Sequence, residues 1–271
     1  MGAVDVAEIY SKPRVTQRAW EYGLRPGFAV DLLTKKEDGS HWDLSEEEDV
    51  KLLEKLQARE QPRLFIGSPP CTPFSQLQAM NPKDDKAQQK WDEGVEHMKF
   101  VVQLYRNQLS AGRVFLHEHP AGAKSWGLAE VQKLGTEAGV AIYHADQCMY
   151  GLKTWGNGRA QPVAAKKPTK FMTNSQAMAN QLNKRCRGDH EHQHLVGNRC
   201  AAAAFYPTPL VKAMIRGIAL QSVEDRRLGC INAMPMKFGK NKLGGKDEKM
   251  GTENWRNGKK RHENTFFQVI K

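Results

Sequence analysis

The sequence has little cysteine and no long apolar segment. Its five cysteines are odd in number and widely spaced, which argues against a disulfide framework and predicts a reducing compartment. No apolar run is long enough to cross a membrane, and the N-terminus has neither the basic region nor the apolar core of a secretory signal. We therefore expect an intracellular protein, in the cytoplasm or the nucleus, that has no membrane as a partner.

Acidic residues are in the minority as well. The 271 residues include 41 Lys and Arg against 30 Asp and Glu, which gives a formal net charge of +11. Residues 221–271 contribute twelve basic and six acidic residues, so about half of the excess lies in the last fifth of the chain. A basic balance is typical of proteins that bind polyanions, most often nucleic acids. We favour a nucleic-acid partner over the alternative that the charge only aids solubility.

Apolar and amphipathic segments alternate along most of the chain. Short apolar runs predict buried strands at 4–10, 28–32, 64–66, 113–116 and 140–143. Helical spacing and end signals predict helices at 14–22, 45–61, 91–109, 126–138 and 211–220. The second of these helices is expected to begin with a capping box formed by Ser45 and Glu48, and 81–90 is expected to be a polar loop. This order of elements predicts a doubly wound, mostly parallel α/β sheet.

The most informative stretch is 64–75, with the sequence LFIGSPPCTPFS. A buried strand is predicted to end at Gly67-Ser68, and two prolines then stiffen the turn directly before Cys71. Loops at such strand ends are where ligands and chemistry collect in open α/β sheets. A buried structural cysteine is the alternative, but packing alone gives no reason for the two prolines before it. We therefore interpret Cys71 as a candidate nucleophile.

Two motifs together resemble those of the cytosine-C5 methyltransferase family. The first is Ser68-Pro69-Pro70-Cys71-x-x-Phe74-Ser75, which looks like the family's nucleophile motif. The second is 115–120, FLHEHP, which looks like its second catalytic motif, an apolar strand that delivers a glutamate, here Glu118. With weaker parts the resemblance covers about residues 4–220 and points to a small, phage-like or mobile-element-like member. It implies a methyltransferase-type sheet, Cys71 as the nucleophile that adds to cytosine C6, and Glu118 as the group that protonates N3.

The resemblance also implies S-adenosylmethionine as the methyl donor. Asp31, an acid at the end of the second predicted strand, is placed to accept hydrogen bonds from a ribose, although an exposed loop aspartate is the alternative. The turn at 9–14 lacks the glycines usual in the family, so its backbone is expected to approach the cofactor less closely. Asp43 stands where the family holds an acid that faces the adenine, and an acid favoured by the dipole of the following helix is the alternative. The full set of implied cofactor contacts is Glu8, Ser11, Asp31, Asp43, Ser68, Pro69 and Asn198.

DNA is the expected substrate, with RNA less favoured. A cytosine in duplex DNA must leave the base stack to reach such a site. The implied nucleic-acid contacts are Ser75, Lys166, Lys167 and Thr169, and a solvated basic loop is the alternative for the lysines. The catalytic domain is expected at 1–220, with a reduced target-recognition insertion at about 175–196 that is too short for a core of its own. Specificity for a target sequence would then be low, or it would depend on the basic, poorly ordered extension at 221–271 or on a separate specificity factor.

Histidines and cysteines raise the question of metal. We expect His117 and His119 to point to opposite faces of a strand, where they cannot share an ion. Zinc ligands are also available at Cys186, His190, His192 and His194, with Cys200 as a further candidate, but their spacing matches no common zinc finger. We favour loop histidines near phosphates or in solvent and assign no metal.

Two alternatives to a DNA cytosine-C5 methyltransferase remain open. One is an RNA cytosine-C5 methyltransferase that uses the same two motifs. The other is a methyltransferase-like module that binds nucleic acid without catalysis, suggested by the altered turn at 9–14. The presence of both Cys71 and Glu118 argues against such a loss of catalysis.

Overall fold

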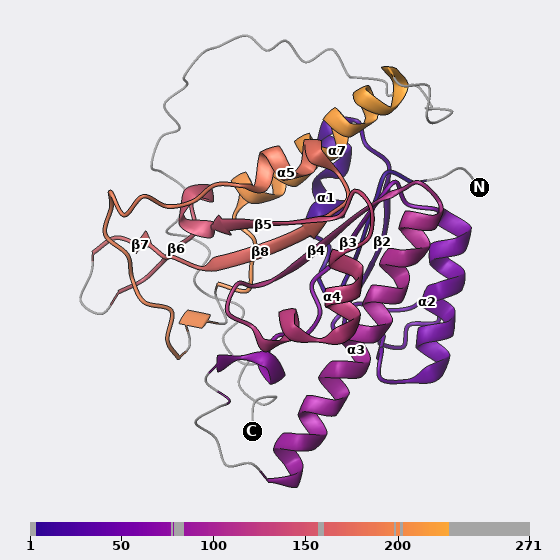
Figure 1. Ribbon diagram of the computed structural model, residues 1–271, viewed down its shortest axis with the longest axis horizontal. Coiled ribbons are helices and arrows are strands. Elements are labelled where there is room, and N and C mark those ends of the chain that lie inside the picture. Colours follow the sequence, from indigo (N-terminus) through magenta and orange to yellow (C-terminus); the bar gives the residue numbers. More distant parts are fainter. Residues whose placement is uncertain are drawn as a thin grey trace. The chain divides into compact units, whose positions relative to one another are not determined.

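The computed structural model describes residues 4–76, 78, 84–156, 160–197, 199–200 and 203–227. Its central element is a six-stranded sheet in the order β2-β1-β3-β4-β8-β5 (Figure 1). The first four of these strands are parallel: β2 (Pro26–Val30), β1 (Val6–Ile9), β3 (Leu64–Gly67) and β4 (Val114–Pro120). Strand β8 (Pro168–Thr173) runs antiparallel to both of its neighbours, β4 and β5 (Ala141–Asp146). The expected α/β class and mostly parallel sheet are confirmed, and they are compatible with a Rossmann-like fold.

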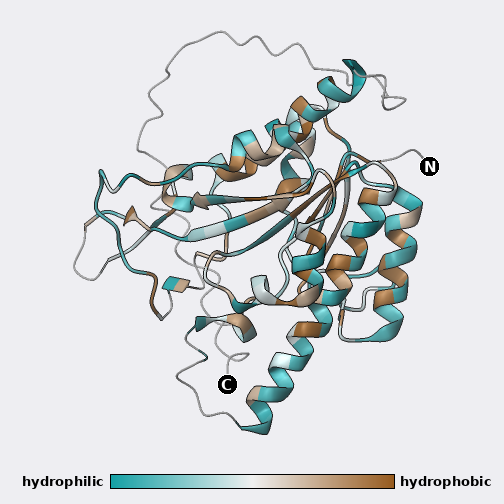
Figure 2. Ribbon diagram, viewed as in Figure 1, coloured by the Kyte–Doolittle hydropathy of each residue, from teal (hydrophilic) through white to brown (hydrophobic). Residues whose placement is uncertain are grey.

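Helices cover both faces of the sheet. Helices α1 (Val15–Ala19), α5 (Gln176–Leu182) and α7 (Thr208–Arg227) contribute to one hydrophobic cluster with the sheet. Helices α2 (Glu47–Glu60), α3 (Asp85–Ser110) and α4 (Ala129–Gly135) contribute to the cluster on the opposite face. Figure 2 shows the parallel strands mostly in the colours of hydrophobic residues, as expected for strands that are buried on both faces.

Strand β3 shows how the sequence produces this arrangement. Leu64 and Ile66 are fully buried in the cluster of α1, α5 and α7, whereas Phe65 is fully buried in the cluster of α2, α3 and α4. Successive side chains of a strand point to opposite faces, so an unbroken apolar run fits a strand with helices on both sides. Gly67 ends the strand against α3, where a Cβ atom would lie 2.8 Å from Val101 Cγ2 and would also clash with the Tyr105 hydroxyl.

Helix α5 belongs to this core. Met178 and Leu182 are fully buried, and a Cβ atom on Gly217 of α7 would lie 2.9 Å from Met178 Cα. The absence of a side chain at Gly217 thus lets the two helices approach closely. Part of the segment expected to form a target-recognition insertion, 175–196, is therefore a core helix, and only the loop after α5 remains for that role.

Helices α2 and α3 do not begin where the sequence predicted, because polar side chains near their starts make other hydrogen bonds than expected. Helix α2 begins at Glu47 without a side-chain cap, so the predicted capping box at Ser45 is wrong. Instead, the Ser45 amide donates to Asp43 Oδ1 at 2.9 Å. Helix α3 begins at Asp85 because the Asp84 side chain caps it by accepting a hydrogen bond from the Ala87 amide at 2.8 Å. The expected loop at 81–90 is thus helical from Asp85 onward.

Two further helices differ from the bounds that the sequence predicted. The helix expected at 126–138 is split into a 3-10 turn, η4 (Lys124–Gly127), and the short helix α4, because Leu128 between them has an extended backbone. Helix α7 continues to Arg227, with Ser222 buried on it, so residues 221–227 are not part of a poorly ordered extension. Residues 228–271 lie outside the described part of the chain. No helix among the described residues is long and apolar enough to cross a membrane.

The remaining described elements are short. Four 3-10 turns, including η4, follow strands or helices, and two of them border the site described below: η2 (Thr72–Phe74) and η5 (Gln147–Tyr150). The fourth, η1 (Trp20–Tyr22), extends α1. Strands β6 (Lys153–Thr154) and β7 (Val163–Ala164) pair with each other in a separate two-stranded sheet.

Candidate active site

One edge of the sheet collects most of the residues that the sequence singled out. Ile9 pairs with Gly67, and Gly67 pairs with His117, so β1 and β3 end at the same level and β4 continues beyond them to Pro120. The antiparallel strand β8 begins at the same edge, where Thr169 pairs with Pro120. Loops that are far apart in the sequence therefore meet there, as expected for an open α/β sheet.

The cysteine loop is held at this edge by its backbone. The Ser68 amide donates to Ile9 O at 3.3 Å, and Pro69 O accepts a hydrogen bond from His119 Nε2 at 3.2 Å. Cys71 follows directly and is exposed, at the start of the turn η2. The loop is thus fixed to both β1 and β4, while the cysteine at its end remains accessible to a ligand.

His119 holds the loop as a neutral ring. Burial lowers the pKa of His119 to about 4, so the imidazole is uncharged near neutral pH. A neutral ring has one donor and one acceptor: Nε2–H donates to Pro69 O, and Nδ1 accepts from the Ser125 hydroxyl at 2.6 Å.

The expectation that His117 and His119 point to opposite faces is wrong. Their rings are stacked with centroids 5.6 Å apart, because residues two apart in a strand share a face. His117 Nδ1 is hydrogen-bonded to the Tyr105 hydroxyl at 3.1 Å, and burial lowers the pKa of His117 as well. Both rings therefore belong to the packed interior around Trp126.

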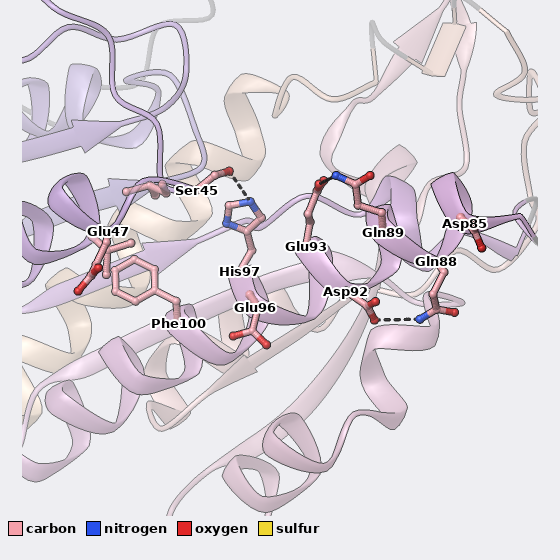
Figure 3. A pocket seen from close by; sticks show the side chains of 12 residues that line it. Ser45, Glu47, Asp85, Gln88, Gln89, Asp92, Glu93, Glu96, His97 and Phe100 are labelled. Carbon is pink, nitrogen blue, oxygen red and sulfur yellow. Dashed lines mark hydrogen bonds between the residues drawn. The ribbon is translucent and has the colours of Figure 1, made fainter.

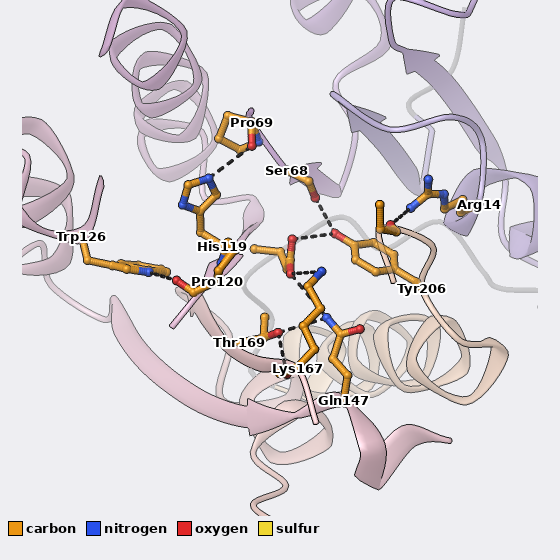
Figure 4. Close-up of polar contacts among 12 residues, drawn as sticks. Arg14, Ser68, Pro69, His119, Pro120, Trp126, Gln147, Lys167, Thr169 and Tyr206 are labelled. Carbon is orange, nitrogen blue, oxygen red and sulfur yellow. Dashed lines mark hydrogen bonds and ion pairs between the residues drawn. The ribbon is translucent and has the colours of Figure 1, made fainter. Parts of the chain in front are cut away.

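Glu118 is nearly fully buried and is surrounded by donors from three other parts of the chain, Gln147, Lys167 and Tyr206, which Figure 4 labels. Its Oε1 lies 3.5 Å from Lys167 Nζ and accepts a hydrogen bond from Gln147 Nε2 at 3.5 Å. Its Oε2 accepts a hydrogen bond from the Tyr206 hydroxyl at 3.3 Å. A buried carboxylate needs such partners to offset the cost of its burial.

Tyr206 connects Glu118 to the cysteine loop. Its hydroxyl also makes a short hydrogen bond with Ser68 Oγ, so one phenol bridges β4 and the loop after β3. Burial, and then the charge of Glu118, raise the pKa of Tyr206 well above its ordinary value, so the phenol remains protonated and keeps its donor.

The two polar atoms of the Gln147 side chain differ in whether they have hydrogen-bond partners. Its Nε2 also donates to Thr169 Oγ1 at 3.0 Å, whereas its Oε1 is buried without a hydrogen-bond partner among the described residues. A buried acceptor without a hydrogen-bond partner is uncommon in proteins.

The charges of Glu118 and Lys167 also affect the pKa of the Cys71 thiol. Partial burial raises its pKa, the Glu118 carboxylate raises it further, and the Lys167 ammonium lowers it. The two candidate catalytic residues are thus electrostatically coupled, and Cys71 rests as a thiol near neutral pH.

The predicted cofactor residues occupy the ends of β1, β2 and β3, but they are not equally available. Glu8 is fully buried, and its Oε1 accepts hydrogen bonds from the amides of Arg14, Val15 and Thr16 at the start of α1. Burial raises the pKa of Glu8, and these hydrogen bonds oppose the rise. Ser11 is also buried, with its hydroxyl donating to Lys12 O.

Asp31 and Asp43 are half-buried, and each uses Oδ1 to accept a backbone amide two residues ahead, from Leu33 and Ser45 respectively. Asn198 lies outside the described residues.

The turn after β1 adopts an unusual conformation without glycine. Tyr10 has φ +55°, in the left-handed region that side chains other than glycine seldom occupy. Its hydroxyl is hydrogen-bonded to His97 Nδ1 of α3 at 3.1 Å. The backbone conformation that glycine would favour is therefore present at this turn, and strained residues of this kind are often found at functional sites. No motif or spacing in the sequence indicated the roles of Tyr10 and His97.

The predicted nucleic-acid contacts separate into two groups. Lys166 is exposed, and Ser75 is half-buried directly after η2. Lys167 and Thr169, in contrast, face inward and hold Glu118 and Gln147. The sequence identified these two positions but not the residues that they contact. Tyr206 and Gln147 were likewise missed, since neither stands in a motif.

Two neighbouring cavities lie along the first half of α3, and the second of them borders the cysteine loop. The first, of about 820 Å³, lies between the start of α3 and the segment before α2 and is lined by Ser45, His97 and Phe100 (Figure 3). Several carboxylates surround it: Glu47, Asp85, Asp92, Glu93 and Glu96. The second, of about 930 Å³, shares His97 with the first and includes Pro70 and Thr72, on either side of Cys71. Cavities of this size accommodate nucleosides and similar ligands.

No protein-family model matches this chain, and a comparison with curated proteins found no match.

Proposed function

We propose that this protein methylates cytosine C5 in DNA, with S-adenosylmethionine as the methyl donor and Cys71 as the covalent nucleophile. The observation that carries the proposal is that Cys71 and Glu118 lie at the same edge of the sheet. A strand-end loop presents an accessible thiol, and a buried carboxylate beside it is held by Lys167, Gln147 and Tyr206. Cytosine C5 chemistry needs both a nucleophile for C6 and an acid for N3.

The proton balance fits this pair. Cys71 must lose a proton to become a nucleophile, and Glu118 needs one before it can protonate N3. In the proposed reaction the thiol proton passes to the carboxylate, directly or through water, and then to N3 as sulfur bonds to C6. S-adenosylmethionine supplies the methyl group that C5 then accepts. A base, for which water is the simplest candidate, then takes the C5 proton, the N3 proton returns to Glu118, and elimination of the Cys71 thiolate releases the product.

Other groups at the site fit the target base. Tyr206 remains a donor, so it keeps Glu118 oriented while the carboxylate changes its protonation state. The buried Oε1 of Gln147, which has no partner among the described residues, offers an acceptor for the exocyclic amine of a flipped cytosine. An amino group satisfies this acceptor, whereas the carbonyl of a uracil would not.

The cofactor side is supported by charge and size. The sulfonium and amino groups of the donor are cationic, and carboxylates surround the cavity of about 820 Å³. Leu44 and Ser45 of its wall follow Asp43, the acid that the resemblance assigns to the adenine. Asp31, Asp43 and Ser68 would hold the cofactor; Glu8 is left out because the start of α1 uses its Oε1.

Trapping with 5-fluorocytosine tests the proposal. Fluorine replaces the proton that must leave C5, so elimination stops and the thioether to Cys71 should persist after denaturation. We expect an adduct on fluorinated duplex DNA only when S-adenosylmethionine is present. Cys71→Ser should give none, while Cys200→Ser, which removes another exposed thiol, should react normally.

Glu118→Gln should form the adduct about 10²–10⁴ times more slowly, because an amide is a poor proton donor to N3. A native chain that binds both DNA and cofactor without forming an adduct would instead indicate a binding module. Methyl transfer onto tRNA but not onto duplex DNA would indicate the RNA enzyme.

A further inference from the structure

A group of four potential metal ligands lies beside the candidate active site. Among the described residues, the ligand atoms of Cys148, Cys186, His190 and His192 all lie within 4.8 Å of one another. Cys148 is on η5, and the other three are on the loop after α5. The group therefore joins two segments that are far apart in the sequence, because strands β6, β7 and β8 and helix α5 lie between them.

The distances match those of a tetrahedral metal centre. Cys186 Sγ lies 3.8 Å from His190 Nε2 and 3.4 Å from His192 Nε2. A tetrahedron with metal–sulfur bonds of about 2.3 Å and metal–nitrogen bonds of about 2.0 Å has edges of about 3.5 Å. The two imidazole nitrogens thus stand where ligands of a shared ion would stand.

We propose that Cys148, Cys186, His190 and His192 bind a zinc ion. Two thiolates and two neutral imidazoles suit zinc, whereas magnesium and calcium require oxygen ligands, which this set lacks. Four protein ligands leave no open position for water, so the site is structural. The spacing within the histidine loop alone did not indicate a metal, because the fourth ligand, Cys148, comes from a different segment.

Neighbouring groups orient the ligands in the way that zinc sites require. Asp189 Oδ1 lies 2.8 Å from His190 Nδ1, which fixes the proton on Nδ1 and leaves the lone pair of Nε2 for the metal. The Gly188 amide donates to Cys186 Sγ at 3.3 Å, and such a bond stabilises a thiolate. The Cys186 amide in turn donates to Asp146 Oδ2 at 2.9 Å, directly before η5.

The proposed ion would fix the wall of the candidate active site. The loop after α5 already contacts the end of β5, where the Asp146 amide donates to Lys184 O at 2.9 Å. Cys148 follows Gln147, whose side chain reaches Glu118 and Thr169. Zinc would therefore hold the turn that positions Gln147, but its binding does not depend on the proposed reaction.

Two other residues of the same region serve as matched controls. Cys200 is exposed and its thiol donates to Leu195 O at 3.3 Å, so it is not one of the four ligands. His194 likewise lies outside the group, although it is only two residues beyond His192. Both were candidates on sequence alone.

Metal analysis of the full chain tests the proposal. Protein expressed with zinc and purified under reducing conditions should contain one zinc per chain by plasma mass spectrometry. Cys186→Ser and His192→Ala should lose most of it, whereas Cys200→Ser and His194→Ala should retain it. Equal zinc in all five proteins, or none in the native chain, would overturn the site.

A cobalt titration of the native chain gives a second measurement that needs no variant to fold. Tetrahedral thiolate ligation should give strong visible d–d bands and near-ultraviolet thiolate charge-transfer bands, and added zinc should abolish both. Weak bands typical of octahedral cobalt would contradict the site. So would a Cys148–Cys186 disulfide detected by mass spectrometry in reduced, zinc-supplied protein. All of these measurements are independent of methyl transfer.

Discussion

Lys167 Nζ lies 3.5 Å from Glu118 Oε1, and only 19% of the lysine side chain is exposed. This ion pair places a positive and a negative charge beside the thiol of Cys71, with opposite effects on its pKa. The pKa of the Cys71 thiol therefore depends on both charges, and its titration can be followed without any substrate.

The first prediction concerns this titration. Glu118→Gln removes a negative charge, so the Cys71 pKa should fall and alkylation at Cys71 should be faster near neutral pH. Lys167→Met removes a positive charge, so the pKa should rise and alkylation should be slower. The measurement is the pH dependence of iodoacetamide reaction at Cys71, resolved from the other cysteines by peptide mass spectrometry. Lys166→Met, at the exposed neighbouring position, is the control. Shifts of the opposite sign would disprove the electrostatic coupling.

The second prediction concerns Tyr206. Tyr206→Phe removes the hydroxyl that bridges Ser68 and Glu118. A hydrogen bond to a charged group contributes roughly 1.5–3 kcal/mol, so 5-fluorocytosine adducts should form roughly tenfold to a hundredfold more slowly. Tyr143→Phe, which removes a hydroxyl bonded to Gln176 at the surface, should have the native rate. Equal rates in the two variants would remove Tyr206 from the site.

The third prediction concerns the basic end of the chain. Because α7 continues to Arg227, the deletion should begin at residue 228 rather than 221. Residues 228–271 hold ten Lys and Arg and four Asp and Glu, a net charge of +6. Their removal should weaken DNA binding and reduce the slope of log affinity against log salt by about 0.9 for each phosphate that this segment neutralises. An unchanged slope would show that the segment does not bind phosphate. The thermal unfolding temperature of the same variant is the control and should be unchanged.

The fourth prediction concerns packing beneath the cysteine loop. Gly67→Ala places a methyl group against Val101 and Tyr105 in the core, so it should reduce the free energy of unfolding by about 1–3 kcal/mol. Gly127→Ala adds a methyl group where no atom lies within 4 Å and should be close to neutral. Urea denaturation of both variants measures the difference, and equal midpoints would contradict the close approach at Gly67.

The resemblance to cytosine-C5 methyltransferases, and the activity that it implies, stay predictions until these experiments are done. The fold class does not depend on them. Strands and helices alternate along the chain in the pattern that predicts a mostly parallel sheet with helices on both faces, and the structure has this sheet.

The core of the sheet and the two central candidates could be predicted from the order of residues alone. The apolar runs at β3 and β4 are long enough to identify buried strands, because local periodicity directly reflects which faces are covered. Cys71 and Glu118 became candidates through those strands, since Cys71 lies in the loop after β3 and Glu118 lies near the carboxyl end of β4. Residues two apart in a strand also share a face, so the sequence already implied that His117 and His119 lie on the same face. The expectation of opposite faces was wrong.

The surroundings of these residues, in contrast, depend on how the chain folds. Tyr206 is 88 positions from Glu118 and 138 from Ser68, yet its hydroxyl contacts both. Cys148 joins the histidine loop from a separate turn. Contacts of this kind depend on the sheet order and on the reversed strand β8, which no local pattern encodes. A motif identifies the groups that can perform a reaction, whereas folding brings together the distant side chains that set their charge, orientation and metal binding.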